Sequence, residues 1–207
     1  MDLSIIPAIG LLLVIVFTIP EVSNSDEFRA EDKKIFSRQS FLQKPQVDPD
    51  FEIIHDYITH KYKKIPTQDA KQIASHLVAF GKKHQVDPKL AAALIARESA
   101  FNRKAISSTG AKGLGQIKDF NYKDLKINDP YDIKQNVSGT VKYLKEMTSK
   151  WKGKPEKVSL ALASYYKGYT AVKKDDAKIE GKTKQYVTDI LDYYKNLVNK
   201  RKEIDSQ

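Results

Sequence analysis

Apolar residues recur at helical spacing through most of the chain after residue 50, and the two-residue alternation typical of β-strands is scarce. The apolar stripes are Phe51, Ile54, Tyr57 and Ile58; Ile73, Ala74, Leu77 and Val78; Leu90, Leu94 and Ile95; Val137, Val141, Leu144 and Met147; Val158, Ala161 and Leu162; and Tyr186, Ile190, Tyr194 and Leu197. Roughly six or seven helices with short links predict a compact all-α domain over residues 51–200.

The helix expected from Asp87 to Ser99 carries a carboxylate on its apolar side. Asp87 and Pro88 are typical of an N-cap and a first helical position, and Glu98 continues the stripe of Leu90 and Leu94. Burial disfavours the ionised form of a carboxyl group, so it raises the pKa and suits the group to act as a general acid. The alternative is a glutamate at a frayed helix end that reaches solvent.

The N-terminal segment is hydrophobic. Residues 3–20 contain no charged side chain and include an apolar run from Leu11 to Phe17, slightly short for a membrane span of about 20 residues. Residues 1–25 are therefore expected to form a signal peptide or a membrane anchor, which places the rest of the chain in the periplasm or otherwise outside the cytoplasmic membrane. We expect a polar linker over 26–50 and a charged tail over 201–207.

Charge and composition restrict the functional classes. The formal net charge of +10 favours anionic partners such as cell-wall polymers, acidic lipids or nucleic acid, although scattered lysines also simply solvate a surface. The absence of cysteine excludes disulfides, a thiol nucleophile and cysteine-ligated zinc. The histidines show no spacing typical of metal ligands, so we expect neither a metal nor another cofactor.

Several motifs follow one another in a fixed order. They are Glu98-Ser99, Gly113-Leu114-Gly115-Gln116-Ile117, Ser164-Tyr165-Tyr166-Lys167-Gly168 and Gln185-Tyr186-Val187. In this order they resemble the soluble lytic transglycosylase (SLT) domain, which is related to goose-type lysozyme. The resemblance covers about residues 66–198 and implies a lysozyme-like helical fold with a substrate cleft.

The resemblance also implies an activity. Members of the family cleave the β-1,4 bond between MurNAc and GlcNAc in peptidoglycan without water, and release 1,6-anhydromuropeptides. Glu98 would serve as the single catalytic acid and base. It would first protonate the bridging oxygen and then accept a proton from the 6-hydroxyl group that closes the anhydro ring, with help from the N-acetyl group of the substrate.

Five further residues match substrate-binding positions of the family: Ser99, Ser107, Gln116, Tyr165 and Tyr186. Tyr165 matches the tyrosine that the family places beside the acid. Each residue also has a structural alternative: a polar helix end for Ser99, a turn for Ser107, a surface position for Gln116 and core packing for the tyrosines.

The chain departs from the family pattern at two positions, because Gly115 replaces a methionine and Tyr166 replaces an asparagine. Asp119 and Asp124 could supply a second carboxylate, but their lysine neighbours favour exposed loop positions.

Other functions remain as alternatives. A hydrolytic muramidase would use the same acid with water as acceptor, and a non-catalytic glycan-binding envelope module would keep the fold alone. A nucleic-acid binder is disfavoured, because the basic segment from Lys195 to Lys202 lacks a helix-turn-helix partner. We expect a monomer that binds peptidoglycan strands.

Overall fold

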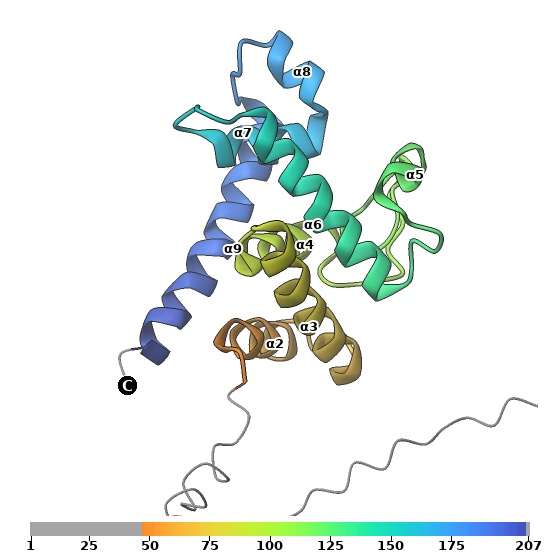
Figure 1. Ribbon diagram of the computed structural model, residues 1–207, viewed down its shortest axis with the longest axis vertical. Coiled ribbons are helices and arrows are strands. Elements are labelled where there is room, and N and C mark those ends of the chain that lie inside the picture. Colours follow the sequence, from red (N-terminus) through yellow and green to blue (C-terminus); the bar gives the residue numbers. More distant parts are fainter. Residues whose placement is uncertain (1–46, 206–207) are drawn as a thin grey trace, which may run out of the picture. The chain divides into compact units, whose positions relative to one another are not determined.

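Helix α4 (Pro88–Ser99) lies at the centre of the domain, in contact with α2 (Pro49–Lys61), α3 (Thr67–His84), α6 (Ile133–Lys150) and α9 (Gly181–Asp205) (Figure 1). The computed structural model describes residues 47–205, with side chains up to residue 200. The shorter helices are η1 (Asp119–Asn121), α5 (Tyr122–Leu125), α7 (Lys157–Lys167) and α8 (Tyr169–Lys174). The leader expected over 1–25, and the linker except for its last residues, lie outside the described part.

The regular secondary structure of residues 47–205 is helical, and this confirms the predicted all-α class. Isolated β-bridges join Lys112 to Ile106 and to Ile117 in the loop between α4 and η1. Helix α9 continues to Asp205, into the segment expected as a charged tail. Among the described residues, no helix combines the length and the apolar character that a membrane span requires.

The sequence of α4 explains its central position. Ala91, Ala92 and Ala93 are fully buried together with Leu94 and Ile95, and their small side chains allow the surrounding helices to approach closely. The carboxylate of Asp87 accepts a hydrogen bond from Lys89 N at 2.8 Å, so the predicted N-cap is confirmed. The helix ends at Ser99, and the next residue, Ala100, adopts a left-handed conformation with φ 50°.

A glycine brings the end of α3 close to the start of α4. A Cβ atom on Gly81 would lie 2.8 Å from both the ring of Pro88 and the carbonyl oxygen of Val86. The helix continues past this glycine to His84. Gly81 therefore permits close packing of α3 against the first turn of α4. The candidate acid lies at the other end of α4.

Candidate active site

Glu98 lies in the last turn of α4 and is half-buried. Burial raises the pKa of its carboxyl group from 4.5 to about 7, and this effect exceeds the opposing effects of a hydrogen bond from Tyr186 and the nearby charge of Arg97. Near neutral pH the side chain is therefore divided between its protonated and ionised forms. This is the protonation equilibrium that a residue needs in order to donate a proton and later accept one.

The carboxyl group of Glu98 is held by a tyrosine that lies far from it in the sequence. The hydroxyl group of Tyr186, on α9, donates a hydrogen bond to Glu98 Oε1, and the tyrosine side chain is 2% exposed. Burial and the charge of Glu98 both raise the pKa of Tyr186 well above its usual value, so the phenol remains a donor. This contact fixes Glu98 in one orientation.

Arg97 strengthens the contact between α4 and α9. Its guanidinium carbon lies 5.4 Å from the centre of the Tyr186 ring, and its Nε donates a hydrogen bond to Asp189 Oδ2 at 2.8 Å. The two neighbouring residues of α4 thus both bind α9, one through the hydroxyl group of Tyr186 and the other through its ring and Asp189.

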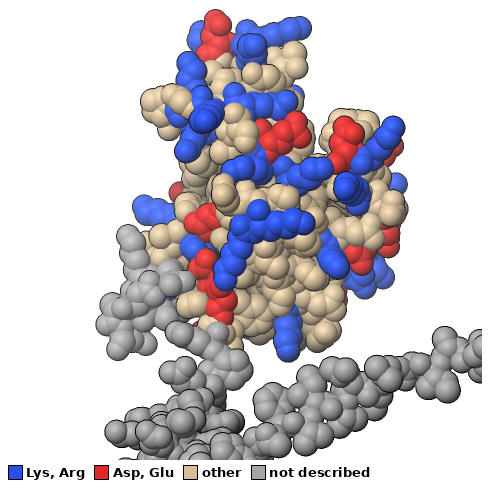
Figure 2. All heavy atoms as spheres, viewed as in Figure 1, with Lys and Arg blue, Asp and Glu red and all other residues tan. Residues whose placement is uncertain are grey.

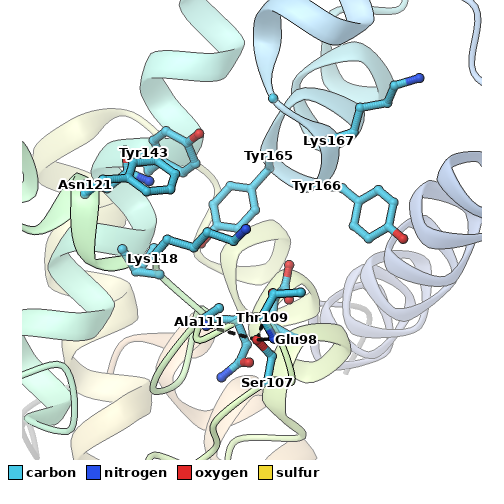
Figure 3. Close-up of a pocket in the computed structure, with 14 residues that line it drawn as sticks. Glu98, Ser107, Thr109, Ala111, Lys118, Asn121, Tyr143, Tyr165, Tyr166 and Lys167 are labelled. Atoms are coloured by element: carbon cyan, nitrogen blue, oxygen red, sulfur yellow. Dashed lines mark hydrogen bonds between the residues drawn. The ribbon is translucent and has the colours of Figure 1, made fainter.

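Glu98 lines a cavity of about 470 Å³. The loop between α4 and η1 forms one wall, and α6 with the end of α7 forms the other (Figure 3). The lining residues are Glu98, Ser107, Thr109, Ala111, Gln116, Ile117, Lys118, Phe120, Asn121, Tyr143, Tyr165, Tyr166, Lys167 and Gly168. Among the described residues, Glu98 is the only carboxylate that lines this cavity, and the exposed Asp119 and Asp124 do not line it.

Tyr165 connects α7 to the loop. Its hydroxyl group donates a hydrogen bond to Gly115 O at 2.7 Å, and its ring packs against Tyr143 with centroids 4.9 Å apart. The hydrogen bond to Glu98 comes from Tyr186, and the hydroxyl group of Tyr165 fixes the loop opposite the acid.

Ser107 and Gln116 line the cavity and also stabilise the loop. Ser107 Oγ accepts a hydrogen bond from Ala111 N at 3.0 Å. Gln116 Nε2 donates to Gly113 O at 2.9 Å and to Ala105 O at 3.2 Å, which leaves its Oε1 without a donor among the side chains and backbone described. The amide oxygen of Gln116 is thus an acceptor available to a ligand.

Ser99 lies apart from the other predicted site residues. Its hydroxyl group donates to Ile95 O at 3.3 Å, within its own helix, and its side chain lines a different cavity. This geometry favours the structural role of a polar helix end over contact with a ligand beside Glu98.

Comparison with known proteins identifies the family. A family model described as the transglycosylase SLT domain matches residues 77–188, which include both Glu98 and Tyr186. The chain belongs to the SLT domain family. The resemblance seen in the motifs is therefore confirmed.

A solved structure shows the same fold. The SLT domain described here is similar to the X-ray structure of an inactive mutant of the lytic transglycosylase Slt from Pseudomonas aeruginosa, with a TM-score of 0.54 and 20% sequence identity. The match covers 84% of this chain and 34% of the other, so this chain spans about a third of the length of that protein. The similarity supports the lysozyme-like helical fold.

The first departure from the SLT pattern, Gly115, has a steric cause. A Cβ atom at this position would lie 1.9 Å from Thr140 Oγ1. The buried side chain of Asn136 also binds this loop, because its Oδ1 accepts a hydrogen bond from Gly115 N at 2.8 Å and its Nδ2 donates to Lys112 O at 3.3 Å. The loop therefore packs directly on α6, in the space that the larger residue of the family would require.

The second departure, Tyr166, lies at the rim of the cavity. Its side chain is 48% exposed, and its ring stacks on Tyr186 with centroids 4.6 Å apart. Figure 3 shows it beside Tyr165 on the same wall. Tyr166 thus covers the residue that holds Glu98 and presents its other face to solvent.

The sequence patterns did not predict that Tyr143, Phe120 and Lys118 line the cavity. Tyr143 follows the helical period of α6 and therefore resembles a core residue. Phe120 is 72% exposed, and it stands in a short helix that has no periodic pattern. A large aromatic residue in a polar loop was the available signal for Phe120.

Proposed function

We propose that this SLT domain is a lytic transglycosylase that cleaves the MurNAc–GlcNAc β-1,4 bond of peptidoglycan without water. The observation that carries the proposal is Glu98 itself, a half-buried carboxyl group with a pKa raised to about 7, which lines a cavity and is held by Tyr186. Cleavage of a glycosidic bond requires a proton donor at the bridging oxygen, and Glu98 meets this requirement near neutral pH.

The reaction proceeds in two proton transfers. Protonated Glu98 gives its proton to the bridging oxygen as the bond to the anomeric carbon breaks, and the N-acetyl group of the substrate stabilises the positive charge that develops there. The 6-hydroxyl oxygen then bonds to the anomeric carbon, and Glu98, now a carboxylate, accepts the hydroxyl proton. The acid is regenerated, and the 1,6-anhydro product differs from a hydrolysis product by one water.

The arrangement of charges supports a single acid and base. Ordinary glycosidases use two carboxylates on opposite sides of the bond. Among the described residues, Glu98 has no second carboxylate across its cavity, while Lys118 and Lys167 add positive charge to its lining. An intramolecular acceptor removes the need for a second carboxylate to activate water.

Other side chains bind the substrate in this proposal. Gln116 Oε1 accepts a hydrogen bond from an amide or hydroxyl group of the sugar, and Ser107 and Tyr165 line the same cavity. Tyr186 orients Glu98 without lining the cavity. Because peptidoglycan lies outside the cytoplasmic membrane, we propose that the domain acts there as a monomer, released or anchored through its N-terminal segment.

The test is mass spectrometry of muropeptides released from purified peptidoglycan by the wild type and by Glu98→Gln. We expect anhydromuropeptides from the wild type and almost none from the variant, which keeps the side-chain volume but cannot exchange a proton. Products heavier by one water would show a hydrolytic muramidase. Binding to peptidoglycan with no release by the wild type would show a glycan-binding module, and equal release by both proteins would exclude Glu98 as the acid.

A further inference from the structure

Two consecutive residues of α4 are paired with two residues of α9 that lie about one turn apart. The hydroxyl group of Tyr186 donates a hydrogen bond to Glu98 Oε1. Arg97 Nε donates a hydrogen bond to Asp189 Oδ2 at 2.8 Å. The guanidinium group of Arg97 also lies over the ring of Tyr186. The ion pair and the hydrogen bond to the acid therefore meet at one side chain, the ring of Tyr186.

Both carboxylate oxygens of Asp189 have a partner. Oδ2 accepts the hydrogen bond from Arg97, and Oδ1 accepts one from Gln185 Nε2 at 2.6 Å. Gln185 lies four residues before Asp189, so the two side chains share one face of α9. The carboxylate is thus held in one orientation, and it fixes the guanidinium group of Arg97 in turn.

The buried ring of Tyr186 contacts two planar groups. The guanidinium carbon of Arg97 lies 5.4 Å from its centre, and the ring of Tyr166 stacks on it with centroids 4.6 Å apart. A guanidinium group stacks on an aromatic ring while its N–H groups hydrogen-bond in its own plane, which a lysine ammonium group cannot do. The position of the Tyr186 hydroxyl group therefore depends on Arg97 as well as on the backbone of α9.

The charge of Arg97 also acts on the acid. Two interactions lower the pKa of Glu98, the hydrogen bond from Tyr186 and the charge of Arg97. Because Asp189 neutralises this charge at close range, it limits the effect of Arg97 on the acid. The other charged or titratable side chains that line the cavity with Glu98 are Lys118 in the loop after α4, Tyr143 on α6, and Tyr165, Tyr166 and Lys167 on α7.

We propose that Arg97 and Asp189 are positioning residues for the reaction at Glu98, and that they act on the acid through Tyr186. This inference rests on the proposed function, because it concerns the acid that the function requires. Neither Arg97 nor Asp189 lines the cavity of Glu98, so neither is placed to contact a ligand bound there. Arg97 holds the ring of Tyr186 and favours the ionised carboxyl group, whereas Asp189 fixes Arg97 and balances its charge. The pair thereby keeps the acid in one orientation while it still holds a proton near neutral pH.

The first test is the titration of Glu98 in variants that each lose one charge. Arg97→Gln removes the cation that favours the carboxylate, so the pKa of Glu98 should rise. Asp189→Asn leaves this cation unbalanced, so the pKa should fall. Each shift should be about 0.2–0.7 pH units, on the scale of one partly exposed charge pair, and Arg97→Gln/Asp189→Asn should titrate close to the wild type. The measurement is NMR of the carboxyl carbon of Glu98 in the intact protein, assigned by its absence from Glu98→Gln. The alkaline limb of the kcat/KM profile should move in the same directions.

A second ion pair of the domain supplies the matched control. Arg103 Nε lies 3.1 Å from Asp69 Oδ2, and the two side chains are 40% and 22% exposed, close to the 37% and 27% of Arg97 and Asp189. Neither Arg103 nor Asp69 lines the cavity of Glu98. Arg103→Gln and Asp69→Asn make the same changes of charge and should leave the titration of Glu98 as it is in the wild type.

The second test separates the charge of Arg97 from its shape. Arg97→Lys keeps the charge but loses the planar group over Tyr186, so the pKa of Glu98 should stay near that of the wild type while kcat falls by about two- to fivefold, on the scale of one cation–π contact. In the Tyr186→Phe background the same substitution should cause no further loss of kcat, because the hydrogen bond that Arg97 helps to position is already absent.

The outcomes separate this proposal from the proposed function. Shifts of the same sign in Arg97→Gln and Asp189→Asn, no shift in either, or equal shifts in the control pair would overturn the proposal and leave the transglycosylase activity intact. Additive losses of kcat from Arg97→Lys and Tyr186→Phe would also overturn it, since the two residues would then act independently. Opposite shifts in the NMR titration of a protein that cleaves no peptidoglycan would keep the action of the pair on Glu98 and exclude the proposed function.

Discussion

The hydroxyl group of Tyr186 reaches across 88 positions of sequence to donate a hydrogen bond to Glu98. Two effects on the acid thus oppose each other, because burial raises the pKa of Glu98 and this hydrogen bond lowers it. The pKa of about 7 is the result of both effects together with the nearby charge of Arg97, which also lowers it. Changes at either residue should therefore be visible in the dependence of the reaction on pH.

Tyr186→Phe should move the alkaline limb of the kcat/KM profile to higher pH. Loss of the donor removes the interaction that favours the carboxylate, so Glu98 holds its proton to a higher pH. The maximal rate should nevertheless fall by at least about tenfold, since the carboxyl group loses its fixed orientation. Tyr194→Phe is a matched control: Tyr194 is also on α9 and hydrogen-bonds to Asp87 at 2.7 Å, at the opposite end of α4. A pH profile unchanged by Tyr186→Phe would contradict this role.

Glu98→Gln should stabilise the protein at alkaline pH. The folded-state pKa of about 7 lies above the ordinary value of 4.5, so the stability that neutral Glu98 contributes is complete below pH 4.5 and is lost as the pH rises through 7. The neutral amide does not ionise. Urea unfolding should show the variant more stable than the wild type at pH 8, by at most about 3 kcal/mol, and similar to it at pH 4. A difference independent of pH would show that the carboxyl group titrates as in an unfolded chain.

Gly115→Ala should destabilise the domain by about 1–3 kcal/mol, because the added methyl group would overlap Thr140 Oγ1. Thr140→Ala removes the nearest clashing atom and should recover part of the loss when the two changes are combined. The measurement is a double-mutant cycle on the free energy of unfolding, with Thr140→Ala alone as the reference. Strict additivity of the two changes would show that the loop moves away from α6 at little cost.

Tyr166→Asn, which restores the family residue, should raise KM for glycan strands. The ring of Tyr166 stacks on Tyr186 and presents an exposed face to the cavity. Loss of this ring removes both a stacking contact and a surface for a sugar ring. A loss of about 0.5–1.5 kcal/mol corresponds to a rise of about two- to tenfold. Tyr166→Phe keeps the ring and should behave as the wild type, and an equal effect of both substitutions would point to the hydroxyl group instead.

The acid and its helix could be predicted from local sequence, whereas its surroundings required the fold. Asp87, Pro88 and the apolar stripe locate α4, and these signals lie within a few residues of one another. The contact of Tyr186 with Glu98 joins residues far apart in the sequence, so only the family resemblance pointed to that tyrosine. The steric conflict that a Cβ atom at position 115 would have with Thr140 depends on the close approach of two elements, which periodicity does not encode.

Short helices were harder to predict than long ones. Helices η1, α5 and α8 contain 3, 4 and 6 residues, too few to show an apolar period. Of these, η1 contributes Phe120 to the cavity, so its wall could not be deduced in full. Tyr143 lies on a long helix that was predicted. Its position in the helical period does not distinguish a residue that lines a cavity from one that is buried in the core.

Because Tyr186 belongs to α9, the order of protein synthesis separates Glu98 from its partner. A ribosome completes α4 well before it reaches α9, and during that interval the carboxyl group lacks both the phenol of Tyr186 and the rest of α9 beside it. A polypeptide shortened before α9 would thus carry every residue that lines the cavity and still lack the hydrogen bond that orients Glu98.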